Sequence, residues 1–202
     1  GADYCQHELR DSKDSRAIYP FEFALRLTHR LDGAALTVTA EVENLSDRQM
    51  PFGFGFHPAF CWPLPGGEGA HRIVLENGAN PALYRIAEGG LIDNRARPSP
   101  FDAGVLPLSY DQFDADAMIF PTGSGEALQL QAENGVALHF SWQGLPNLAL
   151  WQKPGAPYLC LEPWHGMAAY HGAGPQMIDR PYGVSLEPGA KKAFSFSASL
   201  VG

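Results

Sequence analysis

The sequence has no long hydrophobic run, no basic cluster and a small share of charged residues. No stretch of its 202 residues approaches the 18 consecutive apolar residues of a membrane-spanning helix, and no basic-then-apolar leader is present. Lys and Arg number 14 against 22 Asp and Glu, and no basic run is longer than Lys191-Lys192. These absences argue against a membrane segment, an export signal, and a nucleic-acid or anionic-membrane partner.

Cysteine is also scarce. Cys5, Cys61 and Cys160 are odd in number, far apart in the chain and never in a Cys-x-x-Cys spacing. A secreted disulfide framework has an even number of closely spaced cysteines, whereas the reduced thiols of cytosolic proteins need no such pattern. The sequence therefore predicts a cytoplasmic protein.

Spacings typical of metal and cofactor sites are missing as well. His165 and His171 are six residues apart, and no His-x-x-x-His or Cys-x-x-Cys pair supports a metal site even when His57 and Glu162 are added to them. The glycines of residues 53–55 lack the third glycine and the following helix of a dinucleotide-binding loop. We therefore expect no metal and no cofactor.

What the sequence does have is alternation of apolar and polar residues. Hydrophobic residues make up 45% of the chain, and its 22 Gly and 17 Pro imply many turns. Alternating segments joined by turn residues predict antiparallel hairpins. Three hairpins are predicted, over residues 21–42, 128–142 and 184–200.

Helix signals are weak in comparison. Residues 110–117 and 165–171 allow a short turn of helix, and no segment has the pattern of a long amphipathic one. The chain is therefore predicted to be a single all-β domain, an antiparallel sandwich rather than a βαβ fold.

Two segments break the alternation, and each places an ionisable residue directly before a proline. His57 precedes Pro58 in an aromatic, glycine-rich stretch, and Glu162 precedes Pro163 at the end of a strand that reads as buried. Proline cannot donate to a sheet ladder and pushes the preceding residue into an extended conformation, so we expect both residues where strands end or bulge. A histidine and a carboxylate in aromatic surroundings can divide proton transfer between them, since desolvation raises the pKa of a carboxyl group toward working pH.

The same residues also have purely structural interpretations. His57 could be a hydrogen-bonded structural residue, and Glu162 could pair with an arginine at a strand end. Trp164 and Phe54 could belong to the core, or could be rings on which the apolar face of a sugar stacks. Asp116 could be a turn residue or a ligand-binding carboxylate.

Five segments occur in the order seen in the aldose 1-epimerase (galactose mutarotase-like) family, which the chain resembles from about Tyr19 to Leu200. The segments are residues 19–23, 41–44, 50–60, 116–120 and 159–166. The branch that it resembles is bacterial and is also similar to the hexose-6-phosphate 1-epimerases. The resemblance implies an antiparallel β-supersandwich, in which residues 1–202 form one domain corresponding to about the C-terminal two-thirds of the family domain.

The resemblance also implies that the N-terminal strands are missing. Family members carry a further histidine, in a His-Gly-Phe-like motif, and basic residues upstream of the Tyr-Pro-Phe segment. Only 18 residues precede Tyr19 here, and His7 does not lie in such a motif. One wall of the family's sugar site is therefore expected to be absent from this sequence.

The activity that the resemblance implies is interconversion of the α and β anomers of a hexose, with Glu162 as base and His57 as acid. Asp116 matches a carboxylate that binds sugar hydroxyls, and Trp164 and Phe56 would line the pocket. The expected partner is a monosaccharide, either a hexose or a hexose phosphate, and the expected state is a monomer or homodimer. The alternatives are a hexose-6-phosphate 1-epimerase, a non-catalytic carbohydrate-binding or sensor homologue, and a sandwich domain of a larger carbohydrate-active enzyme.

Overall fold

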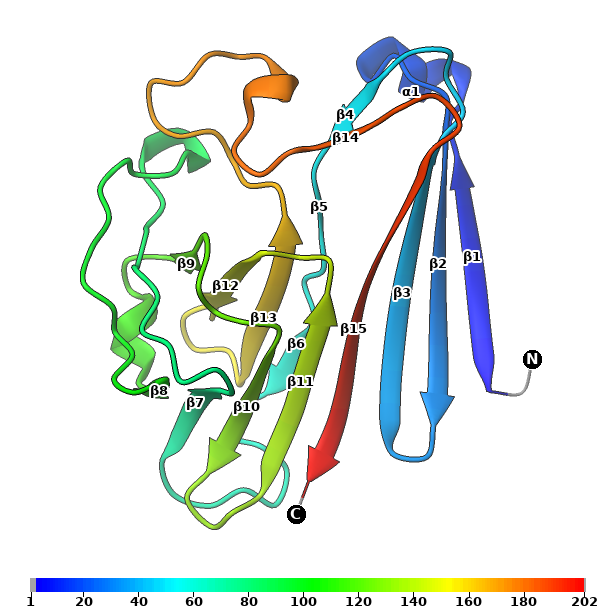
Figure 1. Cartoon of the computed structure of the whole chain (residues 1–202). Coiled ribbons are helices and arrows are strands. Elements are labelled where there is room, and N and C mark those ends of the chain that lie inside the picture. The colour runs from blue at the N-terminus through cyan, green and yellow to red at the C-terminus, as the bar shows by residue number, and fades with distance from the viewer. Residues whose placement is uncertain (1–2, 202) are drawn as a thin grey trace.

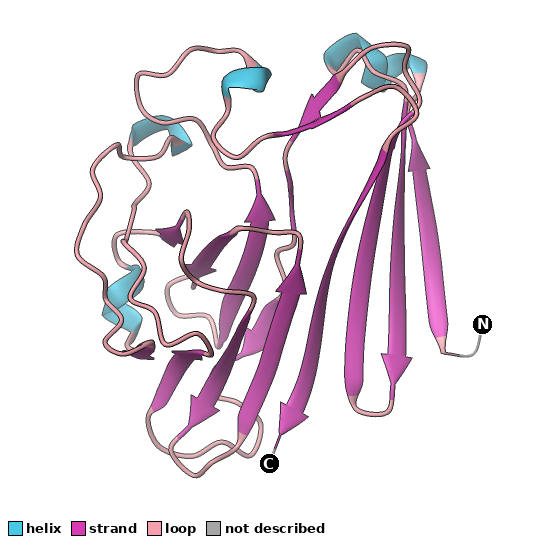
Figure 2. Cartoon of the chain, in the orientation of Figure 1, coloured by secondary structure: helices cyan, strands magenta, loops and turns pink. Residues whose placement is uncertain are grey.

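In the computed structural model, which describes residues 3–201, antiparallel strands dominate and helices are short (Figure 1). The strands are β1 (Tyr4–Arg10), β2 (Phe23–Asp32), β3 (Ala35–Asn44), β4 (Met50–Phe52), β5 (Phe54–Gly55), β6 (Ala59–Cys61), β7 (His71–Leu75), β8 (Val105–Pro107), β9 (Met118–Phe120), β10 (Ala127–Ala132), β11 (Ala137–Gln143), β12 (Asn147–Trp151), β13 (Tyr158–His165), β14 (Val184–Leu186) and β15 (Lys191–Val201). Figure 2 shows the helical segments in cyan, namely α1 (Lys13–Ile18) and the 3-10 turns Glu88–Gly90, Tyr110–Phe113 and Met177–Asp179. No helix in this part of the chain is long and apolar enough to cross a membrane.

Most of the strands belong to two sheets. The larger sheet has the order β1-β2-β3-β15-β11-β10-β7-β8, and the smaller has the order β5-β13-β12-β9, with β6 also paired to β13. Strands β14 and β4 form a separate two-stranded ladder. Every ladder between these strands is antiparallel. The all-β antiparallel fold predicted from the sequence is therefore confirmed.

Two of the three predicted hairpins form as the alternation indicates. Strands β2 and β3 pair around Gly33 (φ 58°), and β10 and β11 pair around Gly135 (φ 94°). Both turns fall on glycine because a positive φ carries no Cβ penalty there. Of the segments predicted to allow a helical turn, residues 110–117 contain one, whereas residues 165–171 do not. Helix α1 was not predicted, and its capping box pairs Ser12 with Ser15.

The third predicted hairpin, over residues 184–200, is wrong. Strand β14 pairs with β4, whereas β15 pairs with β3 and β11. The turn between β14 and β15 is attached to the end of β3, where Asn44 N donates to Ala190 O and Gly189 N donates to Asn44 O, both at 3.0 Å. The turn therefore joins two different ladders rather than two strands of one hairpin.

The core lies between the two sheets. One cluster of buried side chains includes Phe140 and Trp142 of β11, Phe194 of β15, and Leu159 and Leu161 of β13. Full burial of such a side chain stabilises a fold by about 1.5–3 kcal/mol, so this cluster holds the sheets together. Because β13 turns its odd-numbered residues into the core, its even-numbered residues face the other side of the smaller sheet.

The larger sheet extends beyond the smaller one. In Figure 1, β1, β2 and β3 fan out on the right, away from β9, β12 and β13. Exposure on the core-facing side increases outward: Val42 of β3 is 6% exposed, Leu25 opposite it on β2 is half-buried, and Leu9 opposite Leu25 on β1 is 57% exposed. The smaller sheet therefore covers the larger one only as far as about β3, and its edge strand β5 lies near this border.

Candidate active site

His57 lies between two short strands, β5 and β6, that pair with β13 in one register. The last residue of β5 is opposite Trp164, and the first residue of β6 is opposite Cys160. The same register, continued across the gap between β5 and β6, places His57 opposite Glu162. Two residues that are 105 positions apart in the chain thus become direct cross-strand neighbours.

The ladder is interrupted at His57 because Pro58 and Pro163 lack an amide hydrogen. The residue before His57 donates its N–H to Pro163 O, and Leu161 N donates to Pro58 O, each at 3.1 Å. Neither proline can return the second hydrogen bond of its pair. His57 and Glu162 are therefore a non-hydrogen-bonded pair between two half-made pairs, a position where facing side chains come close together.

The sequence prediction about strand ends is correct for one of the two residues. His57 lies between strands, as expected. For Glu162 the prediction is wrong, because β13 continues through Pro163 to His165 and pairs Glu162 with Ala149 of β12. The missing amide hydrogen of Pro163 faces the β5–β6 side, so the ladder with β12 stays intact and holds Glu162 in place.

The two side chains meet at the face of the smaller sheet that points away from the core. His57 Nε2 lies 3.3 Å from Glu162 Oε1, and the Glu162 side chain is 4% exposed whereas that of His57 is 61% exposed. The contact lacks the geometry of a hydrogen bond, and Oε1 has no hydrogen-bond partner among the described residues. No arginine of the described chain pairs with Glu162, so that structural alternative is wrong. An unpartnered buried oxygen is free to bind a ligand.

Glu162 holds its proton more tightly than an ordinary glutamate. Burial, with a smaller contribution from the negative charge of Asp116, raises the pKa of Glu162 to about 7. Both the neutral and the charged form are therefore populated near neutral pH. A carboxyl group with this property can accept a proton and return it, which is the requirement for general acid–base catalysis.

A cavity of about 350 Å³ opens beside this pair. Its lining combines the two ionisable side chains with aromatic rings, glycine backbone and apolar residues. The lining residues are Gly53, Phe54, Gly55, Phe56, His57, Glu162, Trp164, Gly166, Met167 and Ala168. A small number of polar groups in a mostly apolar wall is typical of a site for a small molecule.

Trp164 forms one wall of the cavity because the residue opposite it is Gly55. A Cβ atom on Gly55 would lie 2.3 Å from Trp164 Cδ1, so the half-buried indole lies over a backbone that has no side chain. Unlike the Trp164 indole, the rings of Phe54 and Phe56 point toward the core. The Phe54 ring stacks on Phe194 with centroids 5.0 Å apart, and the Phe56 ring, only 7% exposed, belongs to the core cluster.

Asp116 lies on the exposed loop before β9 and is not among the residues that line the cavity. Its φ of 64° is in the left-handed region, and its Oδ1 accepts a hydrogen bond from Ala117 N at 2.7 Å. The buried Arg85 donates to Asp116 O at 2.6 Å and to Gln112 O at 2.8 Å, which fixes this loop. Sequence reasoning missed Arg85, because nothing in the sequence links it to a loop about thirty residues downstream.

The chain matches the model of a known protein family. The family model described as aldose 1-epimerase matches residues 2–197. The chain belongs to the aldose 1-epimerase family. Two LacX proteins of Lactococcus lactis subsp. lactis, one from a plasmid and one chromosomal, are 30% identical to the chain over 178 residues. The match covers 84% of this chain and 59% of each LacX protein, so the chain spans about three-fifths of the length of these relatives.

Solved structures described as galactose mutarotase related or galactose mutarotase-like share the fold. A galactose mutarotase related enzyme from Lactobacillus acidophilus is 25% identical, with a TM-score of 0.90, over 100% of this chain and 69% of the other. A galactose mutarotase-like protein from Lactobacillus casei is 22% identical, with a TM-score of 0.89, over 100% and 71% of the two chains. The mutarotase-like fold implied by the sequence resemblance is therefore confirmed.

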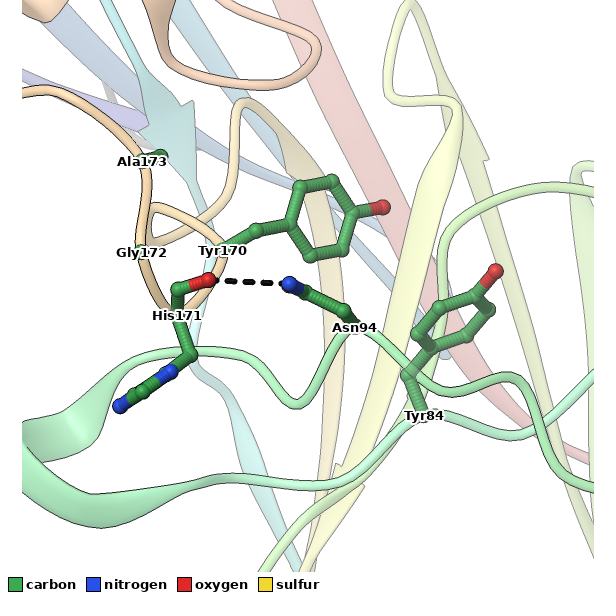
Figure 3. Close-up of a pocket in the computed structure, with 6 residues that line it drawn as sticks. All are labelled: Tyr84, Asn94, Tyr170, His171, Gly172 and Ala173. Atoms are coloured by element: carbon green, nitrogen blue, oxygen red, sulfur yellow. Dashed lines mark hydrogen bonds between the residues drawn. The ribbon is translucent and has the colours of Figure 1, made fainter.

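A second cavity, of about 380 Å³, has Tyr84, Asn94 and Tyr170 among its lining residues (Figure 3). The rings of Tyr84 and Tyr170 have centroids 6.2 Å apart and pack on the apolar cluster that also contacts Trp164. Asn94 lies between them and donates to His171 O at 2.9 Å, while the His171 imidazole points away from both tyrosines (Figure 3). Neither of the two cavities has a Lys or Arg among its lining residues in the described chain.

Proposed function

We propose that this member of the aldose 1-epimerase family interconverts the α and β anomers of a hexose by acid–base opening of the sugar ring. The observation that carries the proposal is the opposed pair, in which a buried carboxylate oxygen without a hydrogen-bond partner lies 3.3 Å from an exposed imidazole. The pair borders a cavity with an indole wall, which suits the apolar face of a sugar.

In the proposed reaction, Glu162 acts as the base and His57 as the acid. The Glu162 carboxylate removes the proton of the anomeric hydroxyl while His57 protonates the ring oxygen, and the bond between C1 and the ring oxygen breaks. The resulting aldehyde rotates about the bond between C1 and C2 and presents its other face. Reclosure reverses both proton transfers, so the protein returns to its starting state and no cofactor is consumed.

Other residues are assigned supporting roles in the same proposal. Trp164 stacks on the sugar, Asp116 binds a hydroxyl group, and Phe56 supports the pocket from the core side while its backbone borders the cavity. Neither cavity presents a Lys or Arg among the described residues, so this part of the chain offers no charged partner to the phosphate group of a hexose phosphate. A monomer or homodimer in the cytoplasm stays a prediction.

Polarimetry of freshly dissolved α-glucose and α-galactose, with a chelator in the buffer, tests the proposed activity. We expect the chain to bring both sugars to anomeric equilibrium faster than buffer alone does. Saturable sugar binding without any acceleration would contradict catalysis and would instead indicate a non-catalytic sugar-binding homologue.

The raised pKa of Glu162 predicts the pH dependence of the reaction. The base must be ionised, so kcat/KM should fall by about tenfold per pH unit below pH 7, where Glu162 becomes protonated. The ionisable groups that face Glu162 are His57, Cys160 and Asp116. Asp116→Asn removes a negative charge that raises the Glu162 pKa, so in this variant kcat/KM should begin to fall at a lower pH than in the wild-type protein. A pH profile that is unchanged in this variant would contradict the contribution assigned to Asp116.

Gly55→Ala is expected to weaken sugar binding by about tenfold, because the new methyl group must displace the Trp164 indole from the cavity wall. The measurement is the sugar dissociation constant, together with a change in tryptophan fluorescence. Gly174→Ala is the matched control, since a Cβ atom at Gly174 meets nothing within 4 Å. Unchanged affinity in Gly55→Ala would show that the indole does not contact the sugar.

A further inference from the structure

Cys160 lies next to the acid–base pair, and the proposed reaction does not use its thiol. Cys160 precedes Glu162 by two residues in β13, so both side chains leave the strand on the same face. One ligand atom from each of His57, Cys160 and Glu162 lies within 4.8 Å of the other two. No other trio of His, Cys, Asp or Glu residues between positions 3 and 201 gathers so closely.

The spacing of these atoms is close to that of a tetrahedral zinc site. With bonds of about 2.0–2.1 Å to nitrogen or oxygen and about 2.3 Å to sulfur, neighbouring ligand atoms lie roughly 3.3–3.6 Å apart. The distance of 3.3 Å between His57 Nε2 and Glu162 Oε1 already matches such an edge. The distances to the sulfur are at most 4.8 Å and need to shorten by at most about 1.2 Å to reach an edge of about 3.6 Å. The exposed His57 side chain has room to move.

Burial and unmet hydrogen bonding point to a ligand at the same place. Cys160 is 2% exposed and Glu162 is 3% exposed, so two of the three ligands are held by the sheet and need no ordering when a cation binds. Glu162 Oε1 is a buried acceptor without a hydrogen-bond partner, and it lies on the side of His57. A cation would give this oxygen the partner that it lacks in the described chain.

We propose that His57, Cys160 and Glu162 form a three-ligand site for a thiophilic divalent cation, with Zn²⁺ as the fitting ion. The imidazole binds through a neutral nitrogen, and the thiol binds as thiolate after its proton passes to the buffer. The thiolate and the carboxylate together balance the charge of the cation. A fourth position stays open toward the cavity.

Cobalt substitution tests the site in the full chain with Cys5 and Cys61 changed to Ser. This background leaves Cys160 as the one thiol and removes the exposed Cys5–His7 pair, whose Sγ and Nε2 atoms lie 3.1 Å apart. We expect Co²⁺ to produce a thiolate-to-cobalt charge-transfer absorption with visible bands of a tetrahedral ion, and Zn²⁺ to abolish them. Absence of the charge-transfer absorption in this background would overturn the proposal.

Affinity measurements on variants identify the ligands. Zn²⁺ binding, measured by calorimetry, should weaken by about 10- to 100-fold or more in His57→Gln and in Cys160→Ser. Even the loss of a residue that only hydrogen-bonds a metal ligand typically weakens metal binding by that factor. His57→Gln changes an exposed side chain, so it tests the site even where Cys160→Ser does not fold. His139→Gln is the matched control, because the half-buried His139 forms a similar contact with Glu76, at 3.0 Å, and the exchange should leave the affinity unchanged. Unchanged affinity in His57→Gln would overturn the site.

The cobalt and calorimetry results do not depend on the proposed sugar reaction. If the protein also binds a hexose in the cavity, the hexose and Zn²⁺ should compete, and this expectation alone rests on the proposed function. A cobalt spectrum unaffected by hexose, in a protein that binds the sugar, would place the two ligands apart and would contradict the shared site. The expected cobalt spectrum in a protein without epimerase activity would support the metal site and contradict the proposed function.

Discussion

Glu162→Gln is expected to slow anomer interconversion by about 10²- to 10⁴-fold, the usual contribution of a positioned general acid or base. Glutamine has the shape of glutamate and can hydrogen-bond the anomeric hydroxyl, but it cannot take the proton. Sugar affinity should therefore change much less than kcat. The measurement is the polarimetric rate at pH 8 in the presence of a chelator, where most of the wild-type Glu162 is ionised because burial holds its pKa near 7.

The same exchange should leave the fold intact. Because Glu162 Oε1 is buried without a hydrogen-bond partner, loss of the charge should leave the Tm unchanged or raise it. Glu76→Gln is the matched control, since Glu76 forms the other close histidine–carboxylate contact, with His139 at 3.0 Å, outside the cavity. A wild-type rate in Glu162→Gln, or an equal loss in both variants, would contradict the assignment of the base.

Asn44→Ala is expected to lower the free energy of unfolding by about 3 kcal/mol. Asn44 is fully buried, and its amide nitrogen donates to Arg48 O at 2.8 Å and to Leu186 O at 2.9 Å. Its Oδ1 accepts a hydrogen bond from Ser46 N at 2.9 Å. Each backbone group left without its partner costs about 1–3 kcal/mol where it is buried, and the contact with Leu186 joins β3 to β14.

Thermal unfolding followed by circular dichroism measures this loss. For a chain of this size, about 3 kcal/mol corresponds to a Tm lower by about 6–12 °C. Asn134→Ala is the control, because Asn134 also bonds to backbone through Gly66 O at 2.8 Å but lies on an exposed turn. We expect its effect to stay below about 1 kcal/mol. Equal Tm values for the two variants would contradict the role given to the buried amide.

The sheets could be predicted where pairing is local. The hairpins of β2 with β3 and of β10 with β11 follow from alternation on both sides of a turn that contains glycine, and both form. The hairpin predicted over residues 184–200 failed because its turn is followed by a strand whose partners, β3 and β11, lie far away in the sequence. Alternation shows which face of a strand is buried but does not identify its neighbour.

The site could be predicted in part for the same reason. The dipeptides His57-Pro58 and Glu162-Pro163 single out both residues in the sequence, although only His57 lies where strands end. The shared register of β5 and β6 on β13 brings the two residues together. The same register adds Cys160, which no motif spacing in the sequence indicates. Arg85 could not be predicted either, since it acts on Asp116 through backbone oxygens. Local patterns thus identify candidate residues, whereas long-range pairing decides which of them meet.

Exchange NMR at anomeric equilibrium tests most directly whether His57 and Glu162 work as an acid–base pair. The measurement follows magnetisation transfer between the anomeric protons of α- and β-galactose in the presence of wild-type protein, His57→Gln, Glu162→Gln and the double variant. We predict exchange cross-peaks with wild-type protein only, and a loss in the double variant about equal to that in each single variant, because the two groups act in one step. Cross-peaks of equal intensity with wild-type protein and the double variant, or none with wild-type protein, would contradict the account.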